Sequence, residues 1–368
     1  SVVSTCSYEA RRYGVHSAMP VRQARRLCPQ GVYVTGRHDR YRQVSQEMFA
    51  IFARYSDVIE PLSIDEAFLV VPAAHARSVA TELREEVRAR LGLAVSVGVA
   101  PNKLVAKIAS DLAKPDSLLV IAAEQMEAFL RTLPVERLWG VGPETASRLR
   151  ALGAREVGDI LLLPEASLQV ACGRRRAEQM RLLARGIDDR PVAPRSGPRS
   201  ISDEETYAHD LQAREELLAR LAILCEGAGT RLRRADLQAR TVTVKVRYHD
   251  FLTTSRQASG APVYADAEVY AAAREVFGKA WSGRPVRLLG VRLSGLYGVE
   301  RREDQQLDLF GASTGMNGSA ANPERLQHLE SAMAVDAIRQ RWGPGAIHLG
   351  AALRAGGKRR QDSGPEPS

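Results

Sequence analysis

Two adjacent carboxylates, Asp65 and Glu66, stand between a turn that contains Pro61 and the apolar run 67–71. That run has the length and composition of a strand entering a core, so the pair is expected at a strand end. Neighbouring anions repel, and both stay ionised in a half-buried place only if a cation lies with them. Carboxylates at a strand end commonly hold Mg²⁺ for phosphoryl chemistry, although a solvated pair at a hairpin remains the alternative. On a flat strand neighbouring side chains point to opposite faces, so two adjacent residues can share a metal only if the chain bends between them. Pro61 favours such a bend.

The composition indicates a multidomain protein with an anionic partner. A chain of 368 residues should form two to four domains with a sizeable core. Its net charge of +9 suggests a polyanionic partner, and Arg-rich stretches recur in 1–45, 172–200 and 230–260. These stretches could line one groove, or each could be a solvated face. The four cysteines are far apart, which favours a reducing cytosol and argues against structural zinc. Without a long apolar run or a signal peptide, we expect a cytoplasmic monomer that does not span a membrane.

The first third of the chain mixes helix and strand signals. A helix is expected at 41–55 and a strand at 64–71. Apolar residues at every fourth position from Val79 to Leu91 predict an amphipathic helix. A strand at 94–100 and a helix at 102–113 should follow. This order fits an α+β sheet with helices on one face.

Three lysines of the last of these helices share one face. Lys103, Lys107 and Lys114 lie at spacings of four and seven residues. The face could meet phosphates, and a solvated lysine stripe is equally compatible with the periodicity.

The middle of the chain reads as all-helical from 122 to 190. Gly140 and Gly142 allow a tight turn, after which a helix would present free N–H groups and a positive dipole end to a DNA phosphate. This pattern resembles a helix-hairpin-helix, and a plain Gly-rich connection is the alternative. The Pro-rich stretch 191–198 reads as a linker.

A second, smaller α+β unit is expected after the linker. It combines helices at 215–234 and 269–281 with strands at 241–248 and 286–293. Lys245 and Arg247 would lie on the polar face of its first strand. Beyond Gly298 the chain turns polar, with one last helix suggested by apolar residues between Leu326 and Ile338.

Three sequence blocks, in order, carry a resemblance to a known family. Residues 1–29, the Ser63-Ile64-Asp65-Glu66 block and residues 93–115 closely resemble the Y-family DNA polymerases, in particular the DNA polymerase IV branch. The resemblance covers roughly residues 1–310. It implies an α+β, multidomain, right-hand-like polymerase. Its parts would be fingers at 1–38, palm at 39–121, helical thumb at 122–190, linker at 191–197, little finger at 198–299 and a flexible tail at 300–368.

The resemblance also implies a function and its residues. The expected activity is low-fidelity, template-directed DNA synthesis in translesion synthesis and DNA repair, with two Mg²⁺ ions held by Asp65 and Glu66. The expected partners are primer-template DNA, deoxynucleoside triphosphates and the sliding clamp. Triphosphate contacts are expected from Thr5, Tyr8, Arg11 and Lys114. DNA contacts are expected from Lys103, Lys107, Gly140, Gly142, Lys245 and Arg247. The clamp is expected to bind Gln306, Leu307, Asp308, Leu309 and Phe310.

The resemblance has one large departure. Family members open with a strand that carries a further catalytic Asp and an aromatic pair, and this sequence starts at Ser1, inside the next element. The chain as given is therefore expected to be impaired. Two alternatives stay open: a non-catalytic adaptor that binds clamp and DNA, and a nucleotide cyclase with a similar two-metal palm. The absent Asp favours the adaptor, whereas the retained Asp65-Glu66 pair disfavours it if the full-length gene supplies that Asp. The hairpin motif, the second basic unit and the clamp-like peptide disfavour the cyclase.

Overall fold

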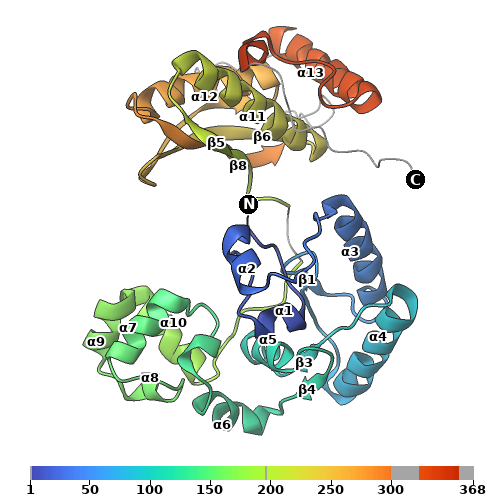
Figure 1. The fold of residues 1–368 in the computed structure, drawn as a ribbon. Helices are drawn as coiled ribbons and strands as arrows, with labels where there is room; N and C mark the ends of the chain where they lie inside the picture. Colours follow the sequence, from blue (N-terminus) through green and yellow to red (C-terminus); the bar gives the residue numbers. More distant parts are fainter. Residues whose placement is uncertain (1, 195–196, 300–322, 356–368) are drawn as a thin grey trace, which may run out of the picture. The chain divides into compact units, whose positions relative to one another are not determined.

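The computed structural model describes residues 2–194, 197–299 and 323–355. The chain divides into two compact units, Ser1–Ser196 and Gly197–Ser368. Both units mix helices and strands, which confirms the predicted α+β class (Figure 1).

The first unit opens with a small lobe of two short helices. They are α1 (Tyr8–Arg12) and α2 (Val21–Leu27). The Ser7 side chain accepts a hydrogen bond from the backbone N–H of Ala10 and caps α1. The lobe has its own apolar core, formed by Val3, Val15, Met19, Ala24 and Cys28. Both helices are therefore fixed within one small body.

Two longer helices and two small sheets follow. Helix α3 (His38–Phe52) packs on α4 (Ala76–Leu91) through buried Met48, Ile51, Phe52, Leu83 and Val87. Antiparallel strands β1 (Ile59–Pro61) and β2 (Ala67–Leu69) form a hairpin, and β3 (Val97–Val99) pairs in parallel with β4 (Leu118–Val120). A short 3₁₀ helix, η1 (Ala73–His75), precedes α4. The expected sheet is thus present as two separate two-stranded sheets.

Helix α5 (Lys103–Leu112) lies tightly against β3. A Cβ at Gly98 would collide with backbone atoms of Ala106 and Ser110, so only glycine permits this approach. Asn102 caps the helix by accepting from the backbone N–H of Val105 at 3.0 Å. The close packing fixes the direction in which the lysines of α5 project.

The rest of the first unit is helical, as predicted. Its elements are η2 (Ala123–Gln125), α6 (Met126–Arg131), η3 (Val135–Arg137), α7 (Pro143–Ala151), α8 (Asp159–Leu162), α9 (Glu165–Cys172) and α10 (Arg174–Ala184). Their apolar core is continuous with α5 through Leu104, Val105 and Ile108.

The second unit is a four-stranded antiparallel sheet covered by helices on one face (Figure 1). The strand order is β5-β8-β6-β7. The strands are β5 (Ser200–Leu211), β6 (Leu237–Tyr248), β7 (Thr253–Val263) and β8 (Val286–Gly298). The helices are α11 (Arg214–Arg234), α12 (Asp266–Ala280), α13 (Pro323–Trp342) and the 3₁₀ helix η5 (Gly350–Ala355).

The prediction of a flexible tail from 300 to 368 is wrong for residues 323–355. Helix α13 packs through buried Ala332 on Tyr264 and Ala265, and ion pairs add to this contact: Arg233 bonds Asp336, and Arg339 bonds Asp266 at 2.6 Å. The apolar residues that suggested the helix include Met333, which is 64% exposed. The helix suggested between Leu326 and Ile338 is present as α13.

Candidate active site

Asp65 and Glu66 lie in the turn that joins β1 to β2. The backbone N–H of Leu62 donates to the Glu66 carbonyl at 2.8 Å, and that of Ser63 donates to the same oxygen at 3.2 Å. The Ser63 hydroxyl also donates to the Asp65 carboxylate. The strand expected from residue 64 begins only at Ala67. The bend that a shared metal requires is therefore present, and the alternation of a flat strand does not apply to these two side chains.

Glu66 of the hairpin contacts a row of alternating charges that runs along α5 and ends at the residue Lys114 just after it. Lys107 Nζ lies 3.0 Å from Glu66 Oε1 and 3.0 Å from both carboxylate oxygens of Asp111. Lys114 Nζ contacts the same Asp111 at 2.8 Å. Burial alone would lower the pKa of Lys107, but hydrogen bonds to Asp111 and Glu66 outweigh it and raise that pKa. Lys107 is thus a fixed cation beside the carboxylate pair.

The carboxylate pair is accessible to solvent. Asp65 is exposed, and the Glu66 side chain is 39% exposed. Among the described residues, no cluster of three or more His, Cys, Asp or Glu side chains is placed to hold a metal. Two carboxylates nevertheless suit Mg²⁺, which usually keeps several waters and binds one or two carboxylates together with substrate phosphates. The donor set present at this turn fits that pattern.

The Lys103 amine is buried and paired, whereas the sequence suggested a lysine that faces phosphates or solvent. Its Nζ contacts both carboxylate oxygens of Glu60, at 2.6 and 2.7 Å, and the Pro191 carbonyl at 3.2 Å. Its side chain is only 9% exposed, and the amine lies 5.2 Å from the centre of the Phe68 ring. Burial opposes ionisation of Glu60, but the hydrogen bonds from Lys103 and Ala193 and the charges of Lys103 and Arg190 together outweigh it and lower the pKa of that carboxyl. In this arrangement Lys103 has no donor left for a DNA phosphate.

A second buried acid, Asp188, binds the N-terminal end of α5. Asp188 accepts from the backbone N–H of Leu104 at 3.0 Å and from the Arg190 guanidinium at 2.6 and 2.8 Å. The guanidinium lies 4.5 Å from the centre of the Trp139 ring, and that ring packs on Phe68 of β2. Sequence patterns do not predict this junction, because its members are as far apart along the chain as Phe68 and Arg190. It fixes the base of the hairpin that carries Asp65 and Glu66.

The predicted triphosphate ligands lie on the N-terminal lobe and after α5. Thr5, Tyr8 and Arg11 are exposed, and Tyr8 and Arg11 stand three residues apart on one side of α1. Among residues 2–194, no hydrogen bond or ion pair joins these three side chains to the hairpin turn. Lys114 is half-exposed and reaches the turn only through Asp111 and Lys107. Asp111 was not predicted, although it stands four residues after Lys107 and three before Lys114.

The glycines of the predicted hairpin motif face open space. Gly140 has φ +91°, where a side chain would be strained, and a Cβ on either Gly140 or Gly142 would meet nothing within 4 Å. Gly142 is the N-cap of α7, and no side chain caps the helix. The Arg176 guanidinium donates to the Gly140 carbonyl at 2.7 Å. The backbone at the start of α7 is thus open to an anion.

Strand β6 has the apolar face and the polar face that its alternating sequence predicted. Val242, Val244 and Val246 are buried under the helices. On the opposite face, Lys245 Nζ contacts Glu204 of β5 at 2.9 Å, and Arg247 Nε donates to Thr253 of β7 at 2.9 Å. Both side chains therefore lie on the helix-free face of the sheet.

Among the residues that the structure describes, no helix is long and apolar enough to cross a membrane.

Comparisons with known proteins agree on one family. The impB/mucB/samB family model matches residues 1–111, the IMS family HHH motif matches 124–154, and the impB/mucB/samB C-terminal domain matches 198–309. A DNA polymerase IV of Alkalilimnicola ehrlichii is 45% identical over 315 residues, which cover 84% of this chain and 88% of the relative.

Solved structures give the same result. A Y-family DNA polymerase chimera of Dbh and Dpo4 has a TM-score of 0.74 at 28% identity, covering 81% of this chain and 88% of the chimera. The insertion ternary complex of Dbh DNA polymerase has a TM-score of 0.60 at 27% identity, covering 81% and 88%. The chain therefore belongs to the impB/mucB/samB family of Y-family DNA polymerases, together with the proteins named DNA polymerase IV.

Proposed function

We propose that this protein catalyses template-directed DNA synthesis of the translesion type at the Asp65–Glu66 turn. The observation that carries the proposal is the pair of adjacent carboxylates in an accessible turn, beside the fixed cation Lys107, in a chain of this polymerase family. Y-family polymerases are nucleotidyltransferases that generally use divalent metal ions. Neither the adaptor nor the cyclase alternative gains support from the relatives described above.

Asp65 and Glu66 are the proposed ligands of two Mg²⁺ ions. Bound there, the ions would assist attack of a primer 3′-oxygen on the α-phosphate and neutralise the charge that develops. Glu66 is the side chain whose charge Lys107 now balances, so it must exchange this partner when a metal enters. Because the pair is partly exposed, that exchange has a low energetic cost.

Four side chains are proposed to bind the triphosphate. Thr5 and Tyr8 supply hydroxyls, Arg11 a guanidinium fork and Lys114 an ammonium. Lys114 is 51% exposed, so its ion pair with Asp111 is weak enough to be replaced by a phosphate contact.

DNA is proposed to be held through its phosphates. The open backbone at Gly140 and Gly142 suits one phosphate, and Lys245 and Arg247 suit others on the helix-free face of β6. Lys107 is proposed to add a cation near the primer end. For Lys103 the burial of its amine supports a structural role instead.

Residues 306–310 are the proposed sliding-clamp peptide, and they lie outside the residues that the structure describes. Burying Leu309 and Phe310 in a partner's pocket would contribute about 1.5–3 kcal/mol each before the cost of ordering the peptide. A monomer acting in the cytoplasm is the proposed working state.

Primer extension tests the proposal. In the protein as its gene encodes it, Asp65→Asn and Glu66→Gln should each lower Mg²⁺-dependent incorporation by at least about 100-fold, because each removes a metal ligand of the transition state. DNA affinity, measured in parallel, should change by less than about twofold, since neither side chain is among the proposed DNA phosphate contacts. Near-normal incorporation by Asp65→Asn would contradict the assignment.

A further inference from the structure

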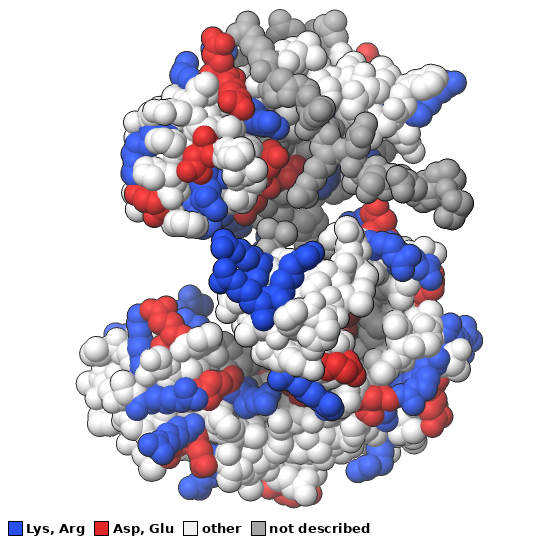
Figure 2. All heavy atoms as spheres, viewed as in Figure 1, with Lys and Arg blue, Asp and Glu red and all other residues white. Residues whose placement is uncertain are grey.

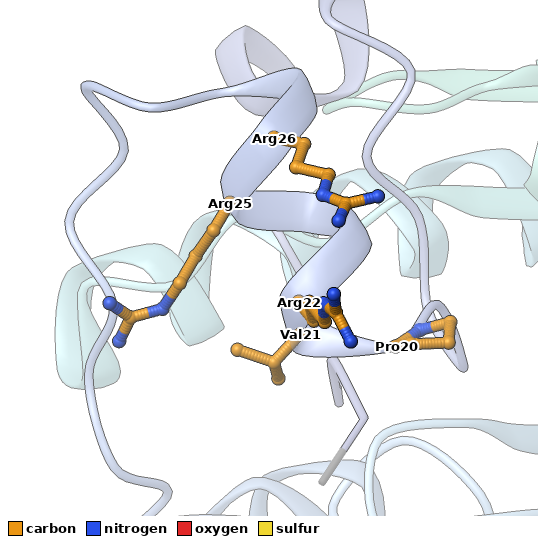
Figure 3. A pocket seen from close by; sticks show the side chains of 5 residues that line it. All are labelled: Pro20, Val21, Arg22, Arg25 and Arg26. Carbon is orange, nitrogen blue, oxygen red and sulfur yellow. The ribbon is translucent and has the colours of Figure 1, made fainter.

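Three arginines of α2 form a cationic patch on the N-terminal lobe. Arg22, Arg25 and Arg26, called here the α2 arginine patch, are all exposed. Together with Pro20 and Val21 they line an open hollow of about 610 Å³ (Figure 3). Figure 2 shows basic side chains gathered over the lobe that carries α2. Arg25 and Arg26 extend to opposite sides of the helix, so the patch is broad (Figure 3).

The patch has no counter-charge in its surroundings. No carboxylate of the described residues lies within ion-pair distance of the three guanidinium groups, and the contact that the structure gives them is Arg25 over the Tyr33 ring, at 4.9 Å. Lys103 and Lys107 of α5 and the following Lys114, by contrast, are all paired with acids. Like charges three and four residues apart destabilise a helix by about 0.2–0.5 kcal/mol per pair. An anionic ligand would remove this repulsion.

Aromatic and apolar side chains stand beside the patch. Val32 is 90% exposed, Val34 81% and Tyr33 36%, all in the loop that follows α2. Guanidinium groups next to an exposed aromatic ring suit the binding of single-stranded nucleic acid, because its phosphates bind the cations and its unpaired bases stack on the ring. A duplex would use the charges alone, since its bases are already stacked.

We propose that the α2 arginine patch and Tyr33 bind the unpaired template strand ahead of the primer end. The inference rests on the proposed polymerase function and adds a ligand surface to it. Helix α1, which carries the proposed triphosphate contacts Tyr8 and Arg11, packs through Ala10 on the apolar core to which α2 contributes Ala24. The backbone of Val3 is hydrogen-bonded to Ala18 and Met19 just before α2, which fixes the two helices together. The unpaired template begins at the base opposite the incoming nucleotide, and the proposed contacts of that nucleotide stand on the same lobe as the patch.

The test compares two primer-templates that share the same duplex. One has a template overhang of a single nucleotide, and the other has an overhang of about ten nucleotides, which is long enough to fill a typical single-strand binding site. Fluorescence anisotropy gives both dissociation constants. The wild type should bind the long overhang more tightly. Arg22→Gln/Arg25→Gln/Arg26→Gln should weaken long-overhang binding by about tenfold and short-overhang binding by less than about twofold. Tyr33→Ala should give a smaller loss, also confined to the long overhang.

A matched control removes the same charge elsewhere. Arg77→Gln/Arg131→Gln/Arg274→Gln changes three exposed arginines that have no proposed DNA contact. It should leave the preference for the long overhang intact, and thermal unfolding should show that both triple variants fold. An equal loss for both overhangs, or no loss in the α2 variant, would overturn the inference. If the wild type bound neither DNA, the proposed function itself would fail, and the inference with it.

Discussion

Two lysines of α5, one helical turn apart, each hold a glutamate of the same hairpin, yet their surroundings differ. Lys103 binds Glu60 at the base of the hairpin, where the two side chains are 9% and 17% exposed. Lys107 binds Glu66 at the tip, where they are 21% and 39% exposed. Lys103 also lies over the Phe68 ring and donates to the Pro191 carbonyl, whereas Lys107 shares its charge with Asp111.

The difference separates a structural pair from an exchangeable one. A buried ion pair is costly to break, because removal of one partner leaves the other charge without compensation. An exposed pair contributes little and gives way easily to another ligand. The hairpin is thus fixed at its base and adaptable at its tip, which is the arrangement that a metal site on a rigid support requires.

The largest expected effect is on stability. Lys103→Met should lower the free energy of unfolding of the first unit by about 3 kcal/mol, because Glu60 would stay buried without its cation. Lys107→Met should cost less than about 1 kcal/mol, because its pair is partly exposed. Amide hydrogen exchange in α5, measured by mass spectrometry, reports on both. Equal losses would contradict the comparison.

A double variant sharpens this test. Removing both charges, as in Lys103→Met/Glu60→Leu, leaves no uncompensated ion and should recover most of the loss. If the double variant were as unstable as Lys103→Met, the lost stability would come from packing rather than from the unpaired carboxylate.

A smaller effect is expected with pH. The pKa of Glu60 is held below its usual value of 4.5, so the folded state binds its proton less readily than the unfolded chain does. The stability that the pair contributes is present above pH 4.5 and is lost as the pH falls through the lower folded value. Protection factors of the α5 amides, which correct for the slower intrinsic exchange in acid, should therefore fall more steeply on acidification in the wild type than in Glu60→Gln. Parallel pH profiles would show that another group is responsible.

Sequence patterns predicted much of the scaffold, because apolar periodicity reflects burial directly. The valines of β6 and the amphipathic helix α4 follow their patterns closely. Strands β5 and β7 were not predicted, since many of their residues are exposed polar side chains and they obtain their partners only from β8 and β6.

For the candidate site, the sequence identified residue types but not their partners. The spacing of Lys103 and Lys107 placed both on one face, and both do reach the hairpin. Spacing could not show that Glu60 and Pro191 surround the Lys103 amine while the Lys107 amine remains accessible. The contacts of Lys103 join it to residues 43 and 88 positions away in the sequence.

The Mg²⁺ dependence of single-turnover nucleotide incorporation, at saturating DNA, tests the central claim most directly. Lys107 balances the charge of Glu66, so Lys107→Met should tighten metal binding and lower the half-maximal Mg²⁺ concentration by about threefold to tenfold. Lys103→Met, assayed at a temperature where it is folded, should leave that concentration unchanged within about twofold, since its amine does not contact Asp65 or Glu66. A shift in Lys103→Met alone, or the same shift in both variants, would contradict the division between a structural lysine and one at the metal site.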